Sequence, residues 1–292
     1  MPESATIIRG DIRDTNGARE ALAGHEFDVV VDFVAYLPEQ VQADIDLFSG
    51  RVGQYVFISS ASAYQKPVQH LPITESTPLV NPFWEYSRNK IACEDLLIRA
   101  NRESGFPATI VRPSHTYDRT RTPFSAGWAI VERMRQGKEA PVHGDGTSLW
   151  TLTHTDDYAR AFVGLLGNTR AVGDTFHITS DDVLTWDQIH RIVGNAAGVP
   201  DPNLIHLSSE VFAEVYPEWG PGLLGDKAFS VVFDNSKVKA LVPDYVATIP
   251  YEQGAAEIVE WFDADPARKA VDPAVDAALD RLTEIHRASM KG

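Results

Sequence analysis

Cysteine is almost missing from this chain of 292 residues, in which Cys93 is the only one. A single thiol excludes an internal disulfide and a thiolate metal cluster, and it favours a reducing compartment, so we predict a cytoplasmic protein. Histidine is more frequent, but no two of the nine histidines are spaced as His-x-x-x-His. Because that spacing is typical of metal sites on helices, we predict no metal ion.

Basic residues are also scarce, since 26 Lys and Arg stand against 41 Asp and Glu, which gives a net charge of −15. Proteins that bind nucleic acid or anionic membranes draw their affinity from clustered Lys and Arg, so we expect neither as a partner. A local pocket can still differ in sign from the whole surface. Long apolar runs are lacking as well: residues 27–37 contain Asp28 and Asp32 and are too few to cross a bilayer. The chain begins with Met-Pro-Glu, which opens neither a basic segment nor an apolar one, so we predict no signal peptide.

What the first part of the chain does contain is an alternation of apolar runs with amphipathic, capped segments. The former are typical of strands buried on both faces of a sheet, and the latter of helices. We expect strands at residues 5–9, 27–35, 54–60 and 107–112, and helices at residues 15–23, 38–48 and 82–104. Such alternation implies right-handed crossovers, and it predicts an α/β fold with a doubly wound parallel sheet.

Beyond residue 113 the pattern is looser. We expect strands at residues 175–178 and 203–206, and helices at residues 124–136, 156–166, 185–197, 208–215, 251–262 and 272–290. Residues 217–225, with Trp219 and three glycines, have the composition of a flexible loop or lid. We therefore divide the chain into residues 1–117, which hold most of the sheet, and residues 118–292, which mainly cap it and are interleaved with its last strands.

Three polar stretches are expected to meet at one edge of this sheet. Residues 59–64, Ser-Ser-Ala-Ser-Ala-Tyr, end one strand, and residues 112–117, Arg-Pro-Ser-His-Thr-Tyr, end the next. The helix between them carries Tyr86 and Lys90, four residues apart and hence on one face. Open parallel sheets bind ligands at the carboxyl ends of their strands. The sequence thus predicts a ligand site formed by these three stretches.

These motifs make the chain resemble the extended short-chain dehydrogenase/reductases, the NAD-dependent epimerase/dehydratase family. Gly10-Asp11, the serine-rich strand end, Tyr-x-x-x-Lys, Gly144-Asp145-Gly146 and residues 155–159, Thr-Asp-Asp-Tyr-Ala, occur in the order of that family. The resemblance runs from about Ala5 to the last expected helices. It implies a Rossmann-like dinucleotide-binding domain in residues 1–117, a substrate-binding region in residues 118–292, NAD or NADP as cofactor, a small-molecule substrate and a homodimer.

The resemblance also implies roles for single residues. Tyr86 would take the proton from a substrate hydroxyl while hydride passes to the nicotinamide. Lys90 would lower the Tyr86 pKa and hold the nicotinamide ribose, and Ser60 would hydrogen-bond the reacting oxygen. Further cofactor contacts are expected from Asp11, Ile12, Phe33, Val34, Ala35 and Pro113, and substrate contacts from Ser62, His115 and Trp150. Each side chain also has an ordinary structural interpretation, such as ending a strand or capping a turn.

The sequence departs from the family at its start. Members open with a strand, a glycine-rich turn that binds the pyrophosphate, a helix and a second strand, but no Gly-x-x-Gly-x-x-Gly occurs here. Residues 5–9 match the third strand of the family, so the first βαβ portion is missing and the edge of a neighbouring strand would be exposed. Three explanations stay open: a truncated or misassigned start, residues 5–9 occupying the vacant central position, or another chain filling the gap.

A second departure concerns the substrate. Where nucleotide-sugar members commonly carry an arginine for the diphosphate, this chain has Trp150, and His115 and Asp118 replace an expected Asn and Gly. An indole cannot make the contacts of a guanidinium, so we expect a nucleoside-diphospho-sugar less than in a typical member. A different sugar, or a polyketide- or terpenoid-like alcohol, could lie against Trp128, Trp150 and Trp219, which could equally be core residues.

The leading hypothesis is an NAD(P)-dependent oxidoreductase, epimerase or dehydratase that acts on a hydroxyl or keto group of a sugar-like or other small molecule through Ser60, Tyr86 and Lys90. One alternative is a cofactor-independent enzyme in which Tyr86 and His115 perform an elimination or isomerisation. Another is a non-catalytic binding protein of the same fold. Plant stem-loop RNA-binding relatives make RNA conceivable as a ligand, and the acidic charge opposes it.

Overall fold

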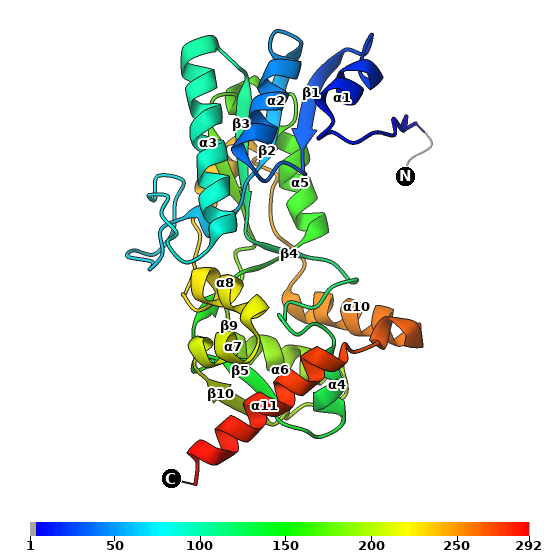
Figure 1. Cartoon of the computed structure of the whole chain (residues 1–292), viewed down its shortest axis with the longest axis vertical. Helices are drawn as coiled ribbons and strands as arrows, with labels where there is room; N and C mark the ends of the chain where they lie inside the picture. Colours follow the sequence, from blue (N-terminus) through cyan, green and yellow to red (C-terminus); the bar gives the residue numbers. More distant parts are fainter. Residues whose placement is uncertain (1–3, 292) are drawn as a thin grey trace.

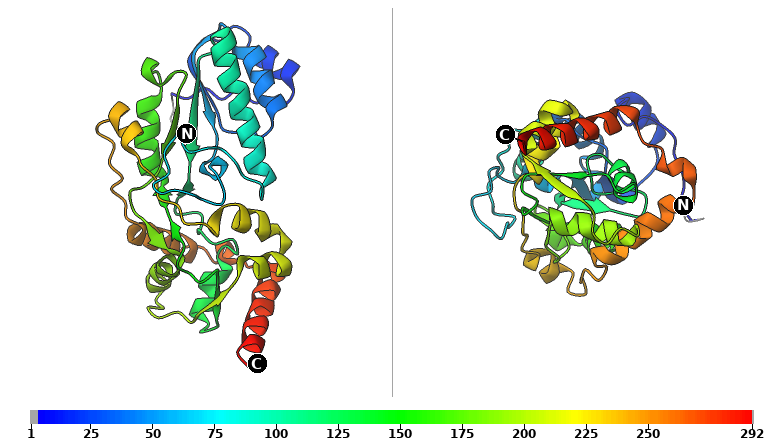
Figure 2. Two further views of the ribbon diagram at one scale, coloured as in Figure 1. Left: turned by 90° about the vertical axis from the view of Figure 1, so that its left-hand side faces the viewer. Right: turned by 90° about the horizontal axis from the view of Figure 1, so that it is seen from below.

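The computed structural model describes residues 4–291, and its centre is a four-stranded parallel sheet. The strands β1 (Phe27–Asp32), β2 (Val52–Ile58), β3 (Ala108–Pro113) and β8 (Thr175–Ile178) lie side by side in that order. Helices α2 (Pro38–Phe48) and α3 (Glu85–Ser104) pack on one face, and α5 (Thr155–Leu165) and α9 (Ser236–Leu241) pack on the other. Figure 2 shows the sheet edge-on between these layers. The predicted doubly wound α/β arrangement is confirmed.

The two-residue period of the strands explains why both faces are covered. In β2, Tyr55 and Phe57 belong to the core beneath α2 and α3, whereas Val56 between them belongs to the core beneath α5. In β3, Ile110 and Val111 are divided between the same two cores. Because successive side chains of a strand point to opposite faces, a run that is apolar throughout must be buried on both sides.

The N-terminal segment does not form the strand expected at residues 5–9. These residues have no regular secondary structure and are exposed, with 61% of Ile7 and 41% of Ile8 accessible, and the segment leads away from the end of β1 (Figure 1). A turn follows, in which the Arg13 amide donates to Asp11 Oδ1, before the short helix α1 (Thr15–Ala21). The strand prediction was wrong because a short β-branched run has no intrinsic preference strong enough to fix it without a pairing partner.

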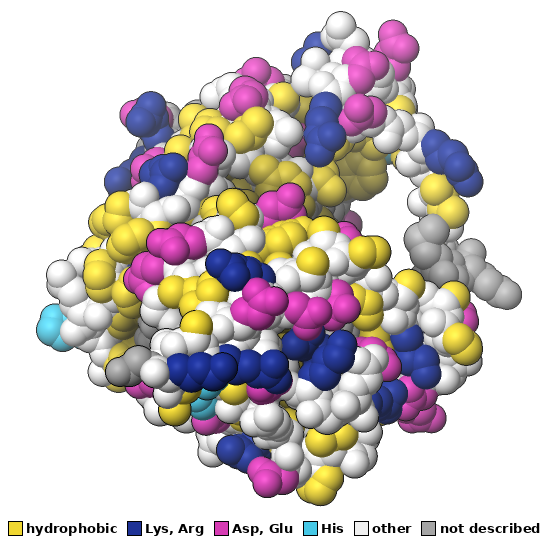
Figure 3. Space-filling view, turned by 60° about the horizontal axis from the view of Figure 1, so that its bottom comes forward, with side chains coloured by type: hydrophobic (Ala, Val, Ile, Leu, Met, Phe, Trp, Pro, Cys, Tyr) yellow, Lys and Arg dark blue, Asp and Glu magenta, His cyan; other side chains and the backbone are white. Residues whose placement is uncertain are grey.

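As a result, β1 is an edge strand in the part of the chain that the structure describes. It pairs with β2 alone among residues 4–291. The space-filling view shows the start of the described chain standing away from the body, over a recess with a largely hydrophobic floor (Figure 3). Of the explanations considered for the unusual start, the one in which residues 5–9 occupy the vacant central position of the sheet is therefore wrong.

Most helices lie where the sequence pattern places them, with shifts at their ends. Helix α2 has the predicted bounds, and α3 ends at Ser104 as expected, with Gly105 at a φ of 70°. Helix α3 begins at Glu85 instead of Pro82. The reason is the Asn81 side chain, whose Oδ1 accepts hydrogen bonds from the amides of Phe83 and Trp84 and holds a separate turn ahead of the helix.

The remaining elements form a second layer at the carboxyl edge of the sheet, in the lower half of Figure 1. Three two-stranded sheets join β4 to β7, β5 to β10 and β6 to β9. Their bounds are β4 (His115–Tyr117), β5 (Ala140–His143), β6 (Leu149–Trp150), β7 (Leu152–His154), β9 (Leu184–Thr185) and β10 (Leu204–Leu207). The helices around them are α4 (Ala129–Arg135), α6 (Trp186–Ala196), α7 (Ser209–Val215), α8 (Gly220–Gly222), α10 (Tyr251–Asp263) and α11 (Pro273–Ser289).

The loop or lid expected at residues 217–225 is instead a run of helical turns. A 3₁₀ turn, α8 and a π-helical turn at Leu223–Lys227 follow one another, and Trp219 and Leu223 are buried. Composition was misleading here, because a proline at the first positions of a helical turn favours the turn, and no glycine of this stretch has a positive φ. The predicted loop is therefore wrong for this segment.

All three tryptophans considered as substrate contacts belong to one hydrophobic core. Trp128 stacks on Phe262 with ring centroids 4.3 Å apart, and Trp219 packs against Phe212 and Tyr216. Trp150 also lines a cavity at the carboxyl edge of the sheet.

None of the helices among residues 4–291 combines the length and the apolar character needed to cross a membrane.

Candidate functional site

A cavity of about 450 Å³ lies where the carboxyl ends of β2 and β3 face the second layer. Parallel strands end at one edge of a sheet, so residues that follow different strands meet there. Six of the residues singled out in the sequence line this cavity: Ser60, Ser62, Tyr86, Pro113, His115 and Trp150. The three polar stretches expected to form one site are thus adjacent in the structure.

The serine hydroxyls of the site form a short hydrogen-bonded chain. Ser60 Oγ lies 2.8 Å from Ser62 Oγ, which accepts a hydrogen bond of 2.7 Å from Ser87 Oγ. Ser60 also caps the 3₁₀ turn Ala61–Ala63 by accepting from the Ser62 amide. Ser87 follows Tyr86 on α3, so these hydroxyls connect α3 to the segment that follows strand β2. The sequence pattern gave no sign of Ser87.

Tyr86 is half-buried among aromatic rings. Its ring centroid lies 4.9 Å from that of Trp84 and 6.2 Å from that of Tyr36. Burial raises the pKa of the Tyr86 phenol, and the Ser60 hydroxyl acts in the opposite direction by hydrogen bonding to it. A tyrosine that serves as a base needs a lower pKa than usual, and therefore needs a positive charge beside it.

Lys90 is buried below Tyr86, on the same face of α3. Its ammonium Nζ donates to the carbonyl oxygens of Ala35 and Ile58, at 2.8 and 2.7 Å. It lies 5.8 Å from the ring centroid of Tyr86, which is within reach of a cation–π interaction. Burial lowers the pKa of Lys90 to about 8, so the side chain stays largely protonated near neutral pH. The structure brings Tyr86 and Lys90 together, as their spacing predicted.

One turn further along α3, Glu94 joins the three elements that carry the site. This fully buried carboxylate accepts hydrogen bonds from the Ser59 hydroxyl and from Arg112 Nε, the latter at 2.9 Å. Ser59 ends β2, and Arg112 lies in β3 directly before Pro113. The hydrogen bonds of Glu94 to Ser59 and Arg112 fix helix α3 relative to the ends of strands β2 and β3. Sequence reasoning missed Glu94, although its spacing of four from Lys90 was a usable signal.

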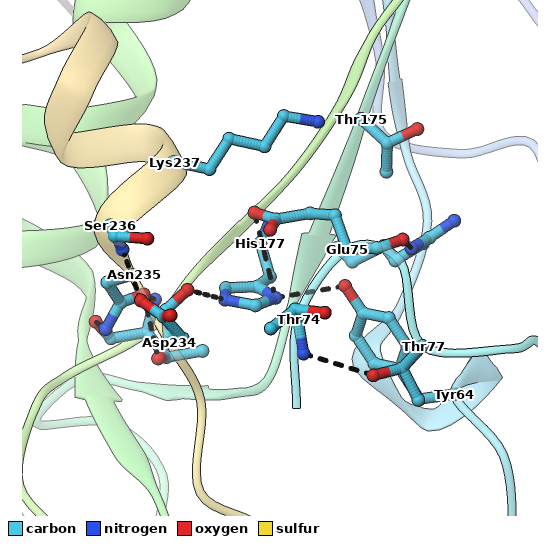
Figure 4. Close-up of polar contacts among 12 residues, drawn as sticks. Tyr64, Thr74, Glu75, Thr77, Thr175, His177, Asp234, Asn235, Ser236 and Lys237 are labelled. Atoms are coloured by element: carbon cyan, nitrogen blue, oxygen red, sulfur yellow. Dashed lines mark hydrogen bonds and ion pairs between the residues drawn. The ribbon is translucent and has the colours of Figure 1, made fainter. Parts of the chain in front are cut away.

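A second polar cluster, around His177 of strand β8, includes Tyr64, Glu75 and Asp234 (Figure 4). Arg112 lies over the ring of Tyr64, whose hydroxyl is 3.0 Å from His177 Nδ1. His177 Nε2 lies 2.8 Å from the Asp234 carbonyl oxygen, and the His177 amide donates to Glu75 Oε1. Burial lowers the pKa of His177, which favours a neutral imidazole that donates from Nε2 and accepts at Nδ1. The cluster ties the loop after β2 to the sheet and has no side chain in the cavity.

His115 and Trp150 form a pair in the cavity wall. Trp150 Nε1 donates to His115 Nδ1 at 3.1 Å. Burial and the nearby charges of Lys227 and Arg121 lower the pKa of His115 to about 3, so the imidazole is neutral. With Nδ1 accepting from the indole, the ring proton belongs on Nε2. His115 can therefore donate a hydrogen bond to a ligand, but it has no lone pair left to act as a base, which weakens the cofactor-independent alternative.

The expected cofactor residues divide between two cavities. Ile12, Val34 and Ala35 line a second cavity of about 240 Å³ beside β1 and α2, whereas Pro113 lies in the first. Two others lie outside both linings: Asp11 accepts from a backbone amide in an exposed turn, and Phe33 is 58% exposed. The exposed edge of β1 explains this division, because no neighbouring strand among residues 4–291 covers these two side chains.

The second cavity contains a buried pair of carboxyl groups. The Tyr55 hydroxyl lies 3.0 Å from Asp32 Oδ2 and 2.7 Å from Asp44 Oδ2. A phenol has one proton and can donate to only one of them. Burial, together with the negative charge of Asp32, raises the pKa of Asp44 to about 7, so a second proton is available to complete the contacts. Sequence reasoning missed this group.

A dinucleotide would find only part of its usual surroundings here. Ser60, Tyr86 and Pro113 line the first cavity, with Lys90 near the Tyr86 ring, and their side chains could contact a nicotinamide and its ribose. Ile12, Val34 and Ala35 offer an apolar wall in the second cavity. Residues 4–291 contain no glycine-rich turn between a strand and a helix that could hold a pyrophosphate. The residues therefore fit the nicotinamide half and leave the phosphates without a cradle.

Comparison with known proteins adds the family. The model of the NAD dependent epimerase/dehydratase family matches residues 1–179. The chloroplast stem-loop binding protein of 41 kDa b from Arabidopsis thaliana is 28% identical over 70% of this chain and 52% of its own length. The 2'-dehydrokanamycin reductase of Streptomyces kanamyceticus is 26% identical over 84% of this chain and 69% of its own length. The chain thus spans about half the length of the first of these relatives.

Solved structures agree in fold. The dTDP-glucose 4,6-dehydratase of Bacillus anthracis, in complex with NAD, superposes with a TM-score of 0.72 at 18% identity, over 89% of this chain and 80% of that one. The UDP-glucose 4-epimerase of Thermotoga maritima, with UDP-glucose, gives a TM-score of 0.71 at 20% identity, over 90% of this chain and 86% of that one. These likenesses confirm the predicted Rossmann-like fold.

Proposed function

Because this chain belongs to the NAD-dependent epimerase/dehydratase family, we propose that it is an NAD(P)-dependent enzyme that oxidises, epimerises or dehydrates a small molecule at a hydroxyl or keto group. The substrate is sugar-like or another small alcohol. Relatives that are reductases, dehydratases and epimerases support this class of activity. The observation that carries the proposal is the grouping of Ser60, Tyr86 and Lys90 beside one cavity.

Each of these three residues has a distinct task in the proposal. Ser60 donates a hydrogen bond to the reacting oxygen and lies next to the hydroxyl of Ser62, which keeps it oriented. Tyr86 removes the proton from the substrate hydroxyl, or returns one to a keto oxygen. Lys90, held by two backbone carbonyls, places a positive charge near the phenol. The bound cofactor supplies a hydride acceptor and, when oxidised, a further positive charge.

The raised pKa of Tyr86 makes this arrangement depend on its ligands. An ordinary tyrosine titrates near ~10, and burial moves the pKa of Tyr86 further up. A cation within a few ångströms at an effective dielectric of ~20 is worth about 4 kcal/mol, or roughly three pKa units. We therefore infer that Tyr86 becomes a competent base only with a positive charge added to that of Lys90.

The second candidate function is binding without NAD(P). The similarity to a stem-loop binding protein favours it. In that case the cavity at Tyr86 would hold a small ligand without redox chemistry. The acidic net charge of −15 still opposes an RNA ligand.

Calorimetric titration of the purified chain with NAD⁺, NADH, NADP⁺ and NADPH separates the two functions. The proposal predicts saturable binding of one pair, with a rise in melting temperature at millimolar cofactor. The matched variant Lys90→Met should weaken this binding at least tenfold, and Lys138→Met, an exposed lysine elsewhere, should leave it unchanged. Neither heat nor a thermal shift with any of the four cofactors would reject NAD(P) dependence.

The predicted homodimer and the cytoplasmic location remain proposals. The surfaces of α2 and α3 that face away from the sheet are the expected interface. Sedimentation equilibrium at micromolar concentration would test the first and cell fractionation the second. A chain that sediments at its monomer mass of 32.2 kDa at all concentrations would reject the homodimer.

A further inference from the structure

Two basic side chains face the cavity at Tyr86 without an acidic partner. Arg121, from the loop after β4, and Lys227, from the π-helical turn, both line this cavity. No ion pair involving either one is formed within residues 4–291. The acidic residue in the same wall, Asp226, pairs with Lys66 at 3.1 Å. In a protein with a net charge of −15, two cations without an ion-pair partner in one cavity wall are unexpected.

The electrostatics of the cavity show that the two charges act on each other and on their surroundings. Burial lowers the pKa of Lys227, the negative charge of Asp226 acts in the opposite direction, and the positive charge of Arg121 lowers the pKa further. Lys227 and Arg121 together contribute to the lowered pKa of His115 in the same wall. Bringing like charges together in a partly desolvated space is unfavourable unless an anion is bound there.

The surroundings of the two cations are suited to oxygen ligands. Thr122 and Ser125 lie in the cavity wall, and only 5% of Thr122 is exposed. The Thr122 hydroxyl has no hydrogen-bond partner among the described residues. Buried hydroxyls are normally paired, so this group awaits a partner from a ligand or water. π-helical turns such as the one that carries Lys227 occur frequently at functional sites.

The position of Lys227 is coupled to the helix that carries Tyr86. Asn81, which forms the turn ahead of α3, donates from Nδ2 to the Gly225 carbonyl oxygen at 2.7 Å. A Cβ atom at Gly225 would come within 2.7 Å of the Trp84 Cβ, so the two segments touch without room for a side chain. The cations and the candidate catalytic residues are therefore held in one fixed arrangement.

We propose that the substrate carries a phosphate or carboxylate group, which Lys227 and Arg121 bind while the reacting hydroxyl or keto group lies against Ser60 and Tyr86. This inference rests on the proposed function, because it concerns the same cavity. Arg121 can bind two oxygens of such a group at once, and Lys227 acts as a point charge. Neither residue occupies position 150, where the sequence comparison with nucleotide-sugar enzymes led us to expect an arginine.

Direct binding without cofactor tests the anion site. Glucose 1-phosphate, UDP-glucose, glucuronic acid, glucose and glucosamine are titrated into the chain at constant ionic strength. We expect the three anions to bind at least tenfold more tightly than glucose, and glucosamine to bind no better than glucose. The order among the three anions distinguishes a monophosphate, a nucleoside diphosphate and a carboxylate as the group that is bound.

Charge-removing variants identify the binding side chains. Arg121→Gln and Lys227→Gln should each weaken binding of the tightest anion at least tenfold, whereas Arg119→Gln and Lys138→Gln, on exposed positions outside the cavity, should not. Arg121 is itself exposed, so its variant should fold even if Lys227→Gln does not. Equal affinity for anions and glucose, or unchanged anion binding by Arg121→Gln, would overturn the inference. Failure of the NAD(P) titration alone would reject the proposed function and leave the anion site standing.

Discussion

Two cavities lie close together at the carboxyl edge of one sheet and carry opposite charges. The cavity beside β1 is lined by Asp32, Glu39 and Asp44 with one basic residue, Arg13. The cavity at Tyr86 is lined by Arg121 and Lys227, and its acidic residue is already paired with a lysine. A net charge of −15 describes neither of them, so the sign of a ligand must be inferred from the wall it would contact.

Lys90 stands between the two cavities. Its ammonium binds the carbonyl of Ala35, which lines the acidic cavity, and lies near the ring of Tyr86, which lines the basic one. The two sides also differ in position: the basic cavity lies between the sheet and the second layer of the fold, while the acidic one borders the exposed edge of β1. Substitutions in the basic cavity should therefore affect mainly turnover, and substitutions in the acidic cavity should affect mainly the free energy of unfolding.

The largest effect is expected on the basic side, at Tyr86. Replacing Tyr86 by Phe removes the proton-transferring hydroxyl, which typically contributes ~10²–10⁴ to a rate. Turnover of the substrate should fall by about that factor, and the melting temperature should stay within a few degrees. The control Tyr216→Phe, in a half-buried position of the second layer, should keep full activity. Full activity of Tyr86→Phe would show that the Tyr86 hydroxyl does not take part in the reaction.

The second effect concerns the carboxylate that ties the two sides together. Glu94→Gln leaves Arg112 as a buried charge without its partner, and losing one member of a buried ion pair costs about 3–5 kcal/mol. Urea unfolding should show a loss of this order. Glu103→Gln, on the exposed face of the same helix, should change the unfolding free energy by less than about 0.5 kcal/mol. Similar stability of the two variants would mean that the Glu94–Arg112 pair does not hold the elements together.

Much of this site was accessible from the sequence because it depends on local spacing. Tyr86 and Lys90 are one helical turn apart, and the bounds of α2 follow from its pattern and from Pro38. Lys227 and Arg121 were beyond such reasoning, since more than one hundred residues separate them and no periodicity relates them. Their meeting depends on the packing of the π-helical turn against the segment before α3.

The two predictions that were wrong, a strand at residues 5–9 and a loop at residues 217–225, failed for the same physical reason. Residues 5–9 have the composition of a strand, but a strand exists only with a partner, and none lies beside them in the described chain. Residues 217–225 have the composition of a loop, but contacts of Trp219 and Leu223 with the core order them as helical turns. In both cases tertiary contacts, or the lack of them, outweigh local preference.

A third effect belongs to the acidic side and depends on pH. The Asp44 pKa is about 7 in the folded chain and near ~4 when unfolded, so the folded state binds the extra proton between these values. The contribution of Asp44 to stability is thus complete below pH ~4 and is lost as the pH rises through about 7. The unfolding free energy should fall by roughly 2 kcal/mol between pH 5 and pH 8 from this group.

Asp44→Asn tests this dependence, because an amide does not titrate. Urea unfolding of the variant should show a smaller decrease between pH 5 and pH 8 than the unmodified chain. Asp46→Asn, on the exposed side of the same helix, should keep the original decrease. An identical pH dependence in Asp44→Asn and in the unmodified chain would show that the carboxyl pair does not share a proton.

The smallest effect is expected from the hydroxyl chain of the basic side. Ser87→Ala removes the donor to Ser62 Oγ, and a buried neutral hydrogen bond contributes about 1 kcal/mol. Ser62 can then turn its hydroxyl away from Ser60, so we expect a loss of a few fold in kcat with little change in KM. Ser104→Ala, near the exposed end of α3, should alter neither constant. If Ser87→Ala raised KM and left kcat unchanged, the serine chain would serve ligand binding, and the orientation of Ser60 at the reacting oxygen would rest on the 3₁₀ turn that it caps.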